Sequence, residues 1–239
     1  MPFQIRQVRD PQDAVIERFG ALQEAVYPEP DMLIPARYVR MMLDMTSGGR
    51  RNFLLVAEDG ARLLGAALFH LLTPVGSGFS SFLGVARAAR GTGVARALHR
   101  ARLETLDSAL GKPVAGVFID VVNPLRLSPE ELEAEWRVGS DPWTRRKAFR
   151  ALGFRQLDVR YEQPVGGPDG GPVTNMDLLF YPHAALEGHA EIPTDLVADT
   201  LRTYWNGWLG EQRAARHARE LRERAGGQTV ALIDPVPAS

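Results

Sequence analysis

A glycine-rich turn joins an apolar, strand-like segment to a long helical segment between residues 85 and 95. The stretch GFSSFLGV (78–85) has the composition of a strand, and VARALHRARLETLDSAL (94–110) has an uninterrupted helical pattern. The start of a helix leaves about four backbone N–H groups without partners and carries about half a positive charge, so it attracts anions. Gly91 and Gly93 allow an anion to approach the amides because they lack side chains. The segment therefore predicts a diphosphate-binding turn, with a plain strand-to-helix connection as the alternative.

The spacing of this turn differs from that of two common phosphate loops. It contains no G-x-G-x-x-G pattern, and no Lys-Ser or Lys-Thr pair follows a G-x-x-x-x-G pattern, which argues against Rossmann and P-loop sites. The turn resembles the acetyl-CoA loop of the GNAT superfamily of N-acetyltransferases, written as Arg or Gln, two residues, Gly, one residue, and Gly or Ala. The matching segment consists of Arg90, Gly91, Thr92, Gly93, Val94 and Ala95, with Val85 five positions before the arginine.

A second match lies about sixty residues further along the chain. KAFRALGFRQLDV (147–159) resembles the late helix-to-strand segment of the same superfamily, which usually has a tyrosine four residues before a Gly-Phe pair. Gly153 and Phe154 fit this pattern, and Phe149 occupies the tyrosine position. Glycine just past a helical segment is a common C-cap, so a helix end followed by an edge strand is the alternative interpretation. Two such segments in the same order as in the superfamily favour the resemblance.

The order of expected elements agrees with that fold. Residues 3–9 alternate as a strand, 10–26 and 35–46 have helical patterns, and three apolar segments between 52 and 85 are separated by hairpin turns. A continuous apolar segment at 114–122, the late helix, and strands at 154–163 and 175–181 follow. We expect an α/β (α+β) domain of the GNAT type over residues 1–182, with a mixed central sheet of about seven strands flanked by helices. Residues 183–239 would form a C-terminal helical extension and tail.

The extension carries an apolar stripe that starts near Thr194. Val197, Leu201, Tyr204, Trp205 and Trp208 recur at helical spacing, and this face is expected to dock onto its own domain or onto a second copy as a homodimer, or else to line the acceptor pocket. Residues 211–224 alternate in charge and predict a solvated helix, and 229–233 predict a short strand.

An insertion at 123–143 lies beside the expected cleft. It would serve as a substrate lid contributing Glu135, Trp136 or Arg137, or simply pack as a surface helix.

Composition limits the classes of partner. The net charge is −1, so nothing favours nucleic acid or an anionic membrane surface, and the chain has no cysteine for disulfides, thiolate metal sites or thiol nucleophiles. No segment reaches the roughly 18 apolar residues of a membrane helix, and no signal-peptide pattern opens the sequence. We expect a cytoplasmic protein, and no pair of His, Asp or Glu has metal-ligand spacing.

The resemblance implies where acyl-CoA would bind. Family members hold it in a V-shaped gap between the strand before the glycine turn and the next parallel strand. Backbone groups near Leu83 and Val85 would pair with the pantetheine amides, and the amides from Gly91 to Arg96 would hold the pyrophosphate. Phe149 has no proton to donate to the leaving thiolate, so its expected role is packing against pantetheine.

Two residues are candidates for catalysis. Asp120 is an ionisable residue inside the apolar segment VAGVFIDVV, where burial is costly unless it is paired or useful; capping a turn with Asn123 is the alternative. Tyr161 begins a Tyr-x-Gln-Pro segment that resembles uncharacterised bacterial members of the superfamily, which also have an acidic strand end followed by proline, as in Asp120 and Pro124. Packing on the sheet is its alternative role. A lone His70 at a strand end is expected to be a satisfied structural residue.

These features predict an acyl-CoA-dependent N-acyltransferase in which an amine attacks the thioester directly. Acetyl-CoA is the expected acyl donor, no metal is expected, and the acceptor is an unidentified small-molecule or peptide amine. The alternative from another class is a non-catalytic domain that binds acyl-CoA as a sensor or interaction module.

Overall fold

A computed structural model describes residues 3–27, 33–47, 49–165, 167 and 171–237. Within these residues the strands are β1 (Gln4–Val8), β2 (Thr46–Ser47), β3 (Arg50–Asp59), β4 (Arg62–Leu72), β5 (Ser77–Val85), β6 (Gly116–Val122), β7 (Arg155–Leu157), β8 (Met176–Pro182), β9 (Glu191–Pro193) and β10 (Thr229–Ile233). The α-helices are α1 (Val15–Glu24), α2 (Ala36–Asp44), α3 (Val94–Leu110), α4 (Pro129–Arg137), α5 (Pro142–Ala151), α6 (Thr194–Leu209) and α7 (Glu211–Ala225).

One mixed sheet organises the chain. Over the described ranges, nine strands follow in the order β1-β3-β4-β5-β6-β8-β7-β10-β9, and β2 pairs with β3. The expected fold class is confirmed, and the sheet is larger than the seven strands expected because β9 and β10 of the C-terminal segment extend it. No helix in the described part of the chain is long and apolar enough to cross a membrane.

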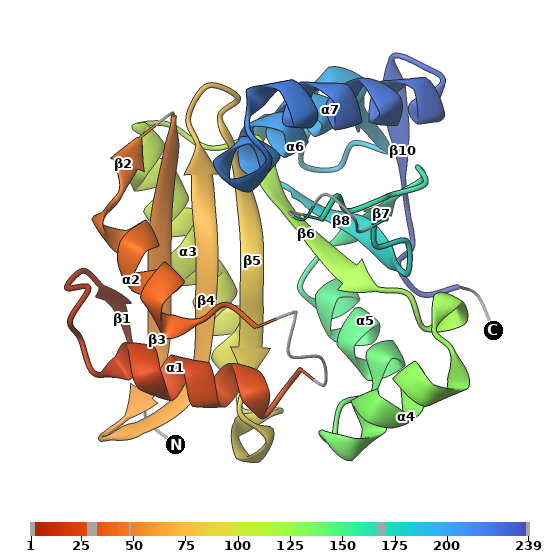
Figure 1. Ribbon diagram of the computed structural model, residues 1–239. Helices are drawn as coiled ribbons and strands as arrows, with labels where there is room; N and C mark the ends of the chain where they lie inside the picture. The colour runs from red at the N-terminus through yellow and green to blue at the C-terminus, as the bar shows by residue number, and fades with distance from the viewer. Residues whose placement is uncertain (1–2, 28–32, 48, 166, 168–170, 238–239) are drawn as a thin grey trace.

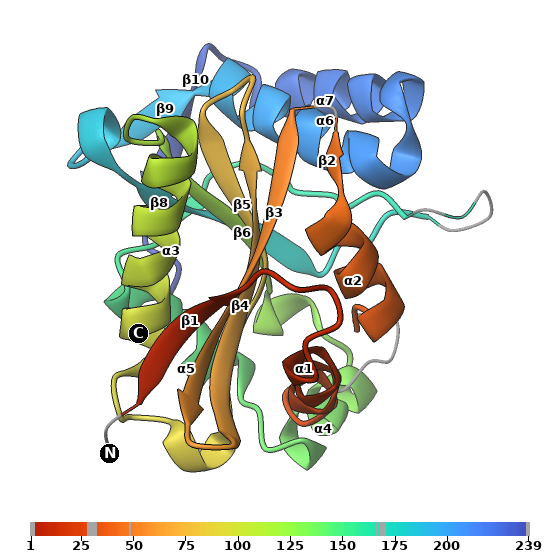
Figure 2. The same ribbon diagram turned by 90° about the vertical axis from the view of Figure 1, so that its left-hand side faces the viewer.

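Helices cover both faces of the sheet (Figures 1 and 2). The helices α1, α2, α6 and α7 lie on one face, and α3 lies on the other with α5. Successive residues of β4 show why its sequence is apolar throughout: Leu68 packs in the cluster with α1 and α2, and Phe69 packs in the cluster with α3. A strand buried on both faces loses the alternation of polar and apolar residues.

The strands β5 and β6 separate soon after they meet. They are parallel and pair only at Gly78 with Val117 and at Phe79 with Phe118. Beyond these pairs the two strands diverge, which Figure 1 shows as β6 leaves the direction of β5. A β-bulge occurs at this point, because β4 pairs Phe69 with Ser80 and Leu68 with Phe82, which leaves Ser81 as the extra residue.

The predicted strand, turn and helix are confirmed. The helix α3 spans the predicted 94–110, begins after Gly93 (φ 90°) and ends at Gly111 (φ 78°), both in the left-handed region. Glycine adopts these backbone angles without the strain that a Cβ brings, so both ends of the helix are fixed by the sequence.

The predicted strand over 154–163 is wrong in its length. The strand β7 ends at Leu157, because β10 pairs only with Gln156 and Leu157, and the amide of Asp158 then donates to the carbonyl of Ala231 at 2.9 Å. The chain leaves the sheet there. Tyr161 therefore lies beyond the strand, fully buried in the cluster that α6 forms with the sheet.

The C-terminal segment packs onto the same sheet. Val197, Leu201, Tyr204 and Trp205 of α6 are buried against β5, β6 and β8, and Trp208 is 38% exposed. The predicted strand at 229–233 is confirmed as β10. The prediction that 211–224 forms a helix is confirmed, and its solvated face is bounded by a buried apolar seam. The seam consists of Ala214, Ala218 and Leu221.

Candidate active site

The glycine turn is exposed and its backbone is open. A Cβ added at Gly91 or at Gly93 would meet no atom within 4 Å, and both glycines have a positive φ. Glycine is thus required here by backbone angle, and the surrounding space is free for a ligand. Within the described chain, the amides of Gly91 and Gly93 have no hydrogen-bond acceptor, whereas the Thr92 hydroxyl donates to the carbonyl of Ala89 at 2.6 Å.

Two arginines flank this turn in different ways. Arg90 donates to the carbonyl of Gly139 at 2.8 Å, which connects the turn to the insertion before α5. Arg96 lies in the first turn of α3 and lines a surface hollow of about 410 Å³. The hollow is lined by Ile5, Gly93, Arg96, Ala97, Arg100, Ala101 and Glu104. Together with the free amides, it forms an anion-attracting surface at the start of the helix.

Among the described residues, the edge of β5 that faces β6 has no strand partner after Phe79. On the other edge, β4 continues to pair with β5, including Ala67 with Leu83 and Gly65 with Val85. Leu83 and Val85 are half-buried and pack in the cluster with α3. A free strand edge leaves backbone donors and acceptors that an extended ligand can satisfy. This edge runs from the β-bulge to the short connection before the glycine turn.

Phe149 is buried on the α5 side of the gap. It packs edge-to-face on Phe154, with ring centroids 5.3 Å apart, in a cluster with Ile119 and Val121 of β6. Leu83 of β5 also contacts this cluster. The apolar surroundings agree with a packing role at this position.

Asp120 and Tyr161 come together although 41 positions separate them. The phenol of Tyr161 donates a hydrogen bond to Oδ2 of Asp120 at 3.1 Å. Burial raises the pKa of Asp120 to about 6, and the hydrogen bond from Tyr161 partly opposes this rise. Burial, reinforced by the charge of Asp120, holds the pKa of Tyr161 well above its usual value. Asp120 is therefore suited to take up a proton near neutral pH, while Tyr161 keeps its own proton.

The charge of Asp120 also affects the pKa values of two further tyrosines. Burial raises the pKa of Tyr204 to about 12, and the charge of Asp120 adds to this rise. The pKa of Tyr27 is raised by burial, with a smaller contribution from Asp120. The charge of Asp120 thus raises the pKa of three tyrosines from separate segments, of which Tyr161 contacts it directly.

Tyr204 belongs to a chain of hydrogen bonds that the sequence did not reveal. Its hydroxyl lies 2.8 Å from Oγ of Ser81 at the β-bulge, and this oxygen lies 2.7 Å from Nε2 of His70. Nδ1 of His70 lies 2.8 Å from Oδ1 of Asn52. His70 is fully buried, and burial followed by the nearby Arg50 holds its pKa well below the usual value, so the ring is neutral. His70 has hydrogen-bond partners on both nitrogens, as expected for a structural residue.

The insertion reaches this region through an ion pair. Glu135 is buried and binds Arg145 of α5 at 2.6 Å, and the guanidinium of Arg145 lies 5.6 Å from the ring centroid of Tyr27. The other two residues of the predicted lid point to solvent: Trp136 is 58% exposed, and Arg137 pairs with Glu133 on its own helix. Whether the insertion closes over a substrate stays a prediction.

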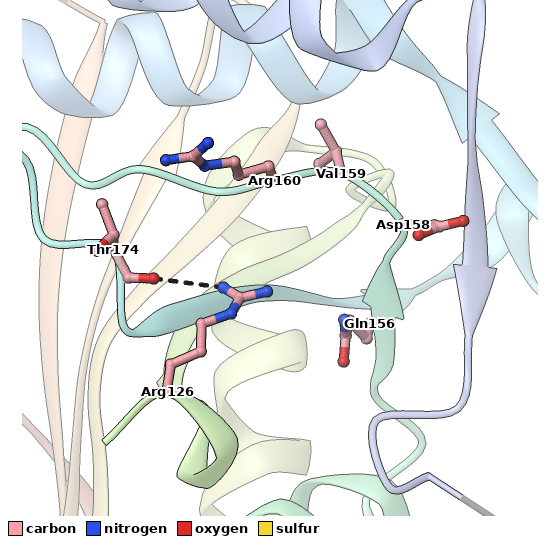
Figure 3. A pocket seen from close by; sticks show the side chains of 6 residues that line it. All are labelled: Arg126, Gln156, Asp158, Val159, Arg160 and Thr174. Carbon is pink, nitrogen blue, oxygen red and sulfur yellow. Dashed lines mark hydrogen bonds between the residues drawn. The ribbon is translucent and has the colours of Figure 1, made fainter. Parts of the chain in front are cut away.

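A second hollow of about 430 Å³ lies beside β7 and contains none of the predicted residues (Figure 3). It is lined by Arg126, Gln156, Asp158, Val159, Arg160 and Thr174. Its guanidiniums are already used, since Arg126 binds the carbonyl of Met176 at 3.1 Å and Arg160 pairs with Glu162 at 3.1 Å. We assign it no function.

In the part of the chain that the structure describes, no group of three or more His, Cys, Asp or Glu residues could hold a metal ion.

Comparison with solved structures identifies the fold. A tandem GNAT protein from the clavulanic acid biosynthesis pathway is similar over 95% of this chain and 67% of its own, with a TM-score of 0.55 and 15% identity. Ard1 from Thermoplasma volcanium is similar over 77% of this chain and 99% of its own, with a TM-score of 0.51 and 12% identity. The sequence itself matches no protein-family model and no curated protein.

Proposed function

Because the chain has the fold of the GNAT N-acetyltransferases, we propose that it is an acyl-CoA-dependent N-acyltransferase with acetyl-CoA as the donor. One observation beyond the fold carries this proposal. The edge of β5 that does not pair with β6 leads from the exposed glycine turn to the level of Asp120, so exposed amides and a carboxylate of raised pKa lie at its two ends.

The proposed donor would lie along this edge. The pyrophosphate would bind the free amides of the glycine turn and Arg96, and the pantetheine would add to β5 near Leu83 and Val85 as an extra strand. Phe149 would pack against it. The thioester would then lie at the β-bulge, where β5 and β6 separate.

The proposed reaction uses Asp120 as the base. An alkylammonium has a pKa of about 10.4, so a base or an ordered water has to remove a proton before the nitrogen can attack. A carboxylate with a pKa of about 6 is mostly ionised at neutral pH and can accept that proton. The nitrogen lone pair forms the C–N bond, the C–S bond breaks with its electron pair on sulfur, and the second proton lost by nitrogen neutralises the thiolate. Tyr161 positions the carboxylate.

The acceptor would be a small-molecule or peptide amine that approaches from the face of α1, α2 and α6, where Asp120 lies. The raised pKa values of the three tyrosines keep the phenols neutral, so the negative charge of Asp120 favours an incoming ammonium. The cytoplasmic location expected from the sequence belongs to this proposal.

The donor site is tested by thermal stabilisation with acetyl-CoA. A ligand that binds only the folded state raises the melting temperature, so the wild-type protein should be stabilised. Arg90→Glu combined with Gly93→Asp should abolish this stabilisation. The matched control is Arg219→Glu with Gly188→Asp, since Arg219 is exposed and Gly188 also has a positive φ with open space around it. Equal stabilisation of both double variants would refute the donor site.

Transfer is tested separately by thiol release. With a panel of primary amines, CoA release should depend on both acetyl-CoA and the amine. Stabilisation by acetyl-CoA without release across the panel would favour the non-catalytic binding module instead.

A further inference from the structure

Arg102 of α3 is a fully buried cation without a carboxylate partner among the described residues. Buried charges in proteins are nearly always paired, because moving an ion out of water is costly. The other nearly buried arginine, Arg146 of α5, follows this rule and binds Asp177 at 2.9 Å. Arg102 is thus an exception that packing alone does not explain.

The guanidinium of Arg102 reaches the point where β5 and β6 separate. Nη1 donates to Oγ of Ser80 at 2.6 Å, and Ser80 is the first residue of β5 after the last pair with β6. Its Cζ also lies 5.6 Å from the ring centroid of Phe154, which packs with Ile119 and Val121 of β6. The guanidinium of Arg102 therefore lies on the α3 face of the sheet, at the point of β5 where its pairing with β6 ends.

The groups around Arg102 do not neutralise it. Burial lowers its pKa to about 9, so it remains a cation at neutral pH. Nη2 binds Nδ1 of His99 at 2.6 Å, and burial followed by the charge of Arg102 lowers the pKa of His99 to about 3. His99 packs on Tyr181 of β8 and on Phe154. Tyr181 in turn lies beside His183, which is paired with Asp107 at 2.9 Å.

His99 and Arg102 each have a buried N–H group without a hydrogen-bond acceptor among the described residues. Nε2 of His99 and Nε of Arg102 have no hydrogen-bond partner within the described residues. Because His99 accepts at Nδ1, its proton is on Nε2. Buried donors without partners are rare, and an absent ligand is one physical reason for them.

We propose that Arg102 is the cation that stabilises the thiolate of CoA as it leaves, a role that rests on the proposed transferase function. In the transfer step the C–S bond breaks and its electron pair moves to sulfur, so negative charge develops at the β-bulge. Arg102 approaches this point from the α3 face, whereas Asp120 lies on the opposite face with α6. Opposite charges thus flank the gap, with the base on the side of the amine and the cation on the side of the thiol. Arg102 would thus stabilise the thiolate that Phe149, at the usual tyrosine position, cannot protonate.

The direct readout is the pKa of CoA bound to the protein, measured from the pH dependence of thiolate absorbance in the ultraviolet. A free thiol has a pKa of about 8.5, and a cation within reach lowers it by about 1 to 3 units. We expect such a lowering in the wild-type complex and its loss in Arg102→Met, with partial recovery in Arg102→Lys. A wild-type value equal to that of free CoA, or equal values in the wild-type and Met complexes, overturns the inference.

Stability and turnover complete the test. Arg102→Met should change the melting temperature little, because removal of an unpaired buried charge offsets the loss of the hydrogen bonds to Ser80 and His99. Arg146→Met is the matched control and should lower it, because Asp177 loses its buried partner. We expect CoA release by Arg102→Met to fall about 10-fold or more, with acetyl-CoA affinity largely kept. A large loss of melting temperature in Arg102→Met would point to a structural role and contradict the proposal.

Failure of this inference is distinguishable from failure of the proposed function. If the wild-type protein binds CoA and releases thiol with an amine while Arg102→Met has an unchanged thiol pKa, only the role of Arg102 is refuted. If the wild-type protein does not bind CoA at all, both proposals are refuted.

Discussion

The phenol of Tyr161 donates a hydrogen bond to Oδ2 of Asp120 at 3.1 Å. The two side chains come from β6 and from the chain beyond β7, and their roles differ. Tyr161 is fully buried, whereas Asp120 is half-buried. In the proposed reaction the carboxylate is therefore the member of the pair that meets the amine, and the phenol holds it in place.

Replacing Asp120 with asparagine should reduce turnover and leave donor binding intact. Removal of a general base costs about 100- to 10,000-fold in rate. The side-chain shape is kept, and the amide oxygen can still accept from Tyr161. Thiol release should therefore fall by about 100-fold or more, while calorimetry should give an acetyl-CoA affinity within about threefold of the wild type. Asp158→Asn, at an exposed position outside the gap, is the control. Turnover equal to that of the control would remove Asp120 from the mechanism.

Replacing Tyr161 with phenylalanine should move the acidic limb of the pH–rate profile. The base has to be ionised, so activity rises with pH through the pKa of Asp120, which is about 6. The hydrogen bond from Tyr161 lowers this pKa, and its loss leaves the effect of burial opposed only by a backbone hydrogen bond. The limb should therefore shift to higher pH, with most of the rate recovered on the alkaline side. An unshifted limb would mean that another group sets the profile.

Asp120 should also make stability depend on pH in an unusual direction. Its pKa is raised from 3.8 to about 6 on folding, so the folded state binds the proton more tightly than the unfolded chain. The free energy of unfolding contributed by this group is therefore largest below pH 4, falls as the pH rises to about 6, and is constant above. Asp120→Asn should consequently gain about 3 kcal/mol over the wild type at pH 8 and little at pH 4. Urea denaturation at the two pH values measures the difference, and a gain of equal size at both would contradict the assignment.

Replacing Tyr204 with phenylalanine should have a small effect on rate. Its hydroxyl binds Ser81, which keeps its second partner, His70. We expect a loss of about 1 kcal/mol in the free energy of unfolding, as for one hydrogen bond, and a rate loss below about 10-fold. Trp208→Phe, on the exposed side of the same helix, is the control. A rate loss as large as that of Asp120→Asn would instead place Tyr204 in contact with the substrate.

Local patterns in the sequence predicted much of the fold. The helix over 94–110 has glycines at both ends, and the apolar segments between 52 and 85 have turn residues between them, so each element is determined by its own residues. The order of these elements then indicated the GNAT fold. The short strand at 229–233 is also visible in its own residues.

Contacts between distant segments could not be predicted in the same way. The strand β7 ends early because of β10, which lies about 75 positions further along the chain, and this ending allows Tyr161 to turn toward Asp120. Tyr204 was recognised only as part of an apolar stripe, because its hydroxyl meets Ser81 only once α6 has packed. Arg102 was missed because an arginine on a helix is usually solvated, and only the fold shows that this one is buried.

Ser81 is the one position in β5 without a partner in β4. The proposed donor site along β5 and the proposed base on β6 lie next to this position. The pairs on either side, Phe69 with Ser80 and Leu68 with Phe82, already lie in register around it. Deletion of Ser81 would thus keep each neighbouring side chain on its present face of the sheet and give β5 a regular pairing with β4. The inserted residue also carries the hydroxyl that joins Tyr204 to His70, so its deletion would remove this link together with the irregularity of β5.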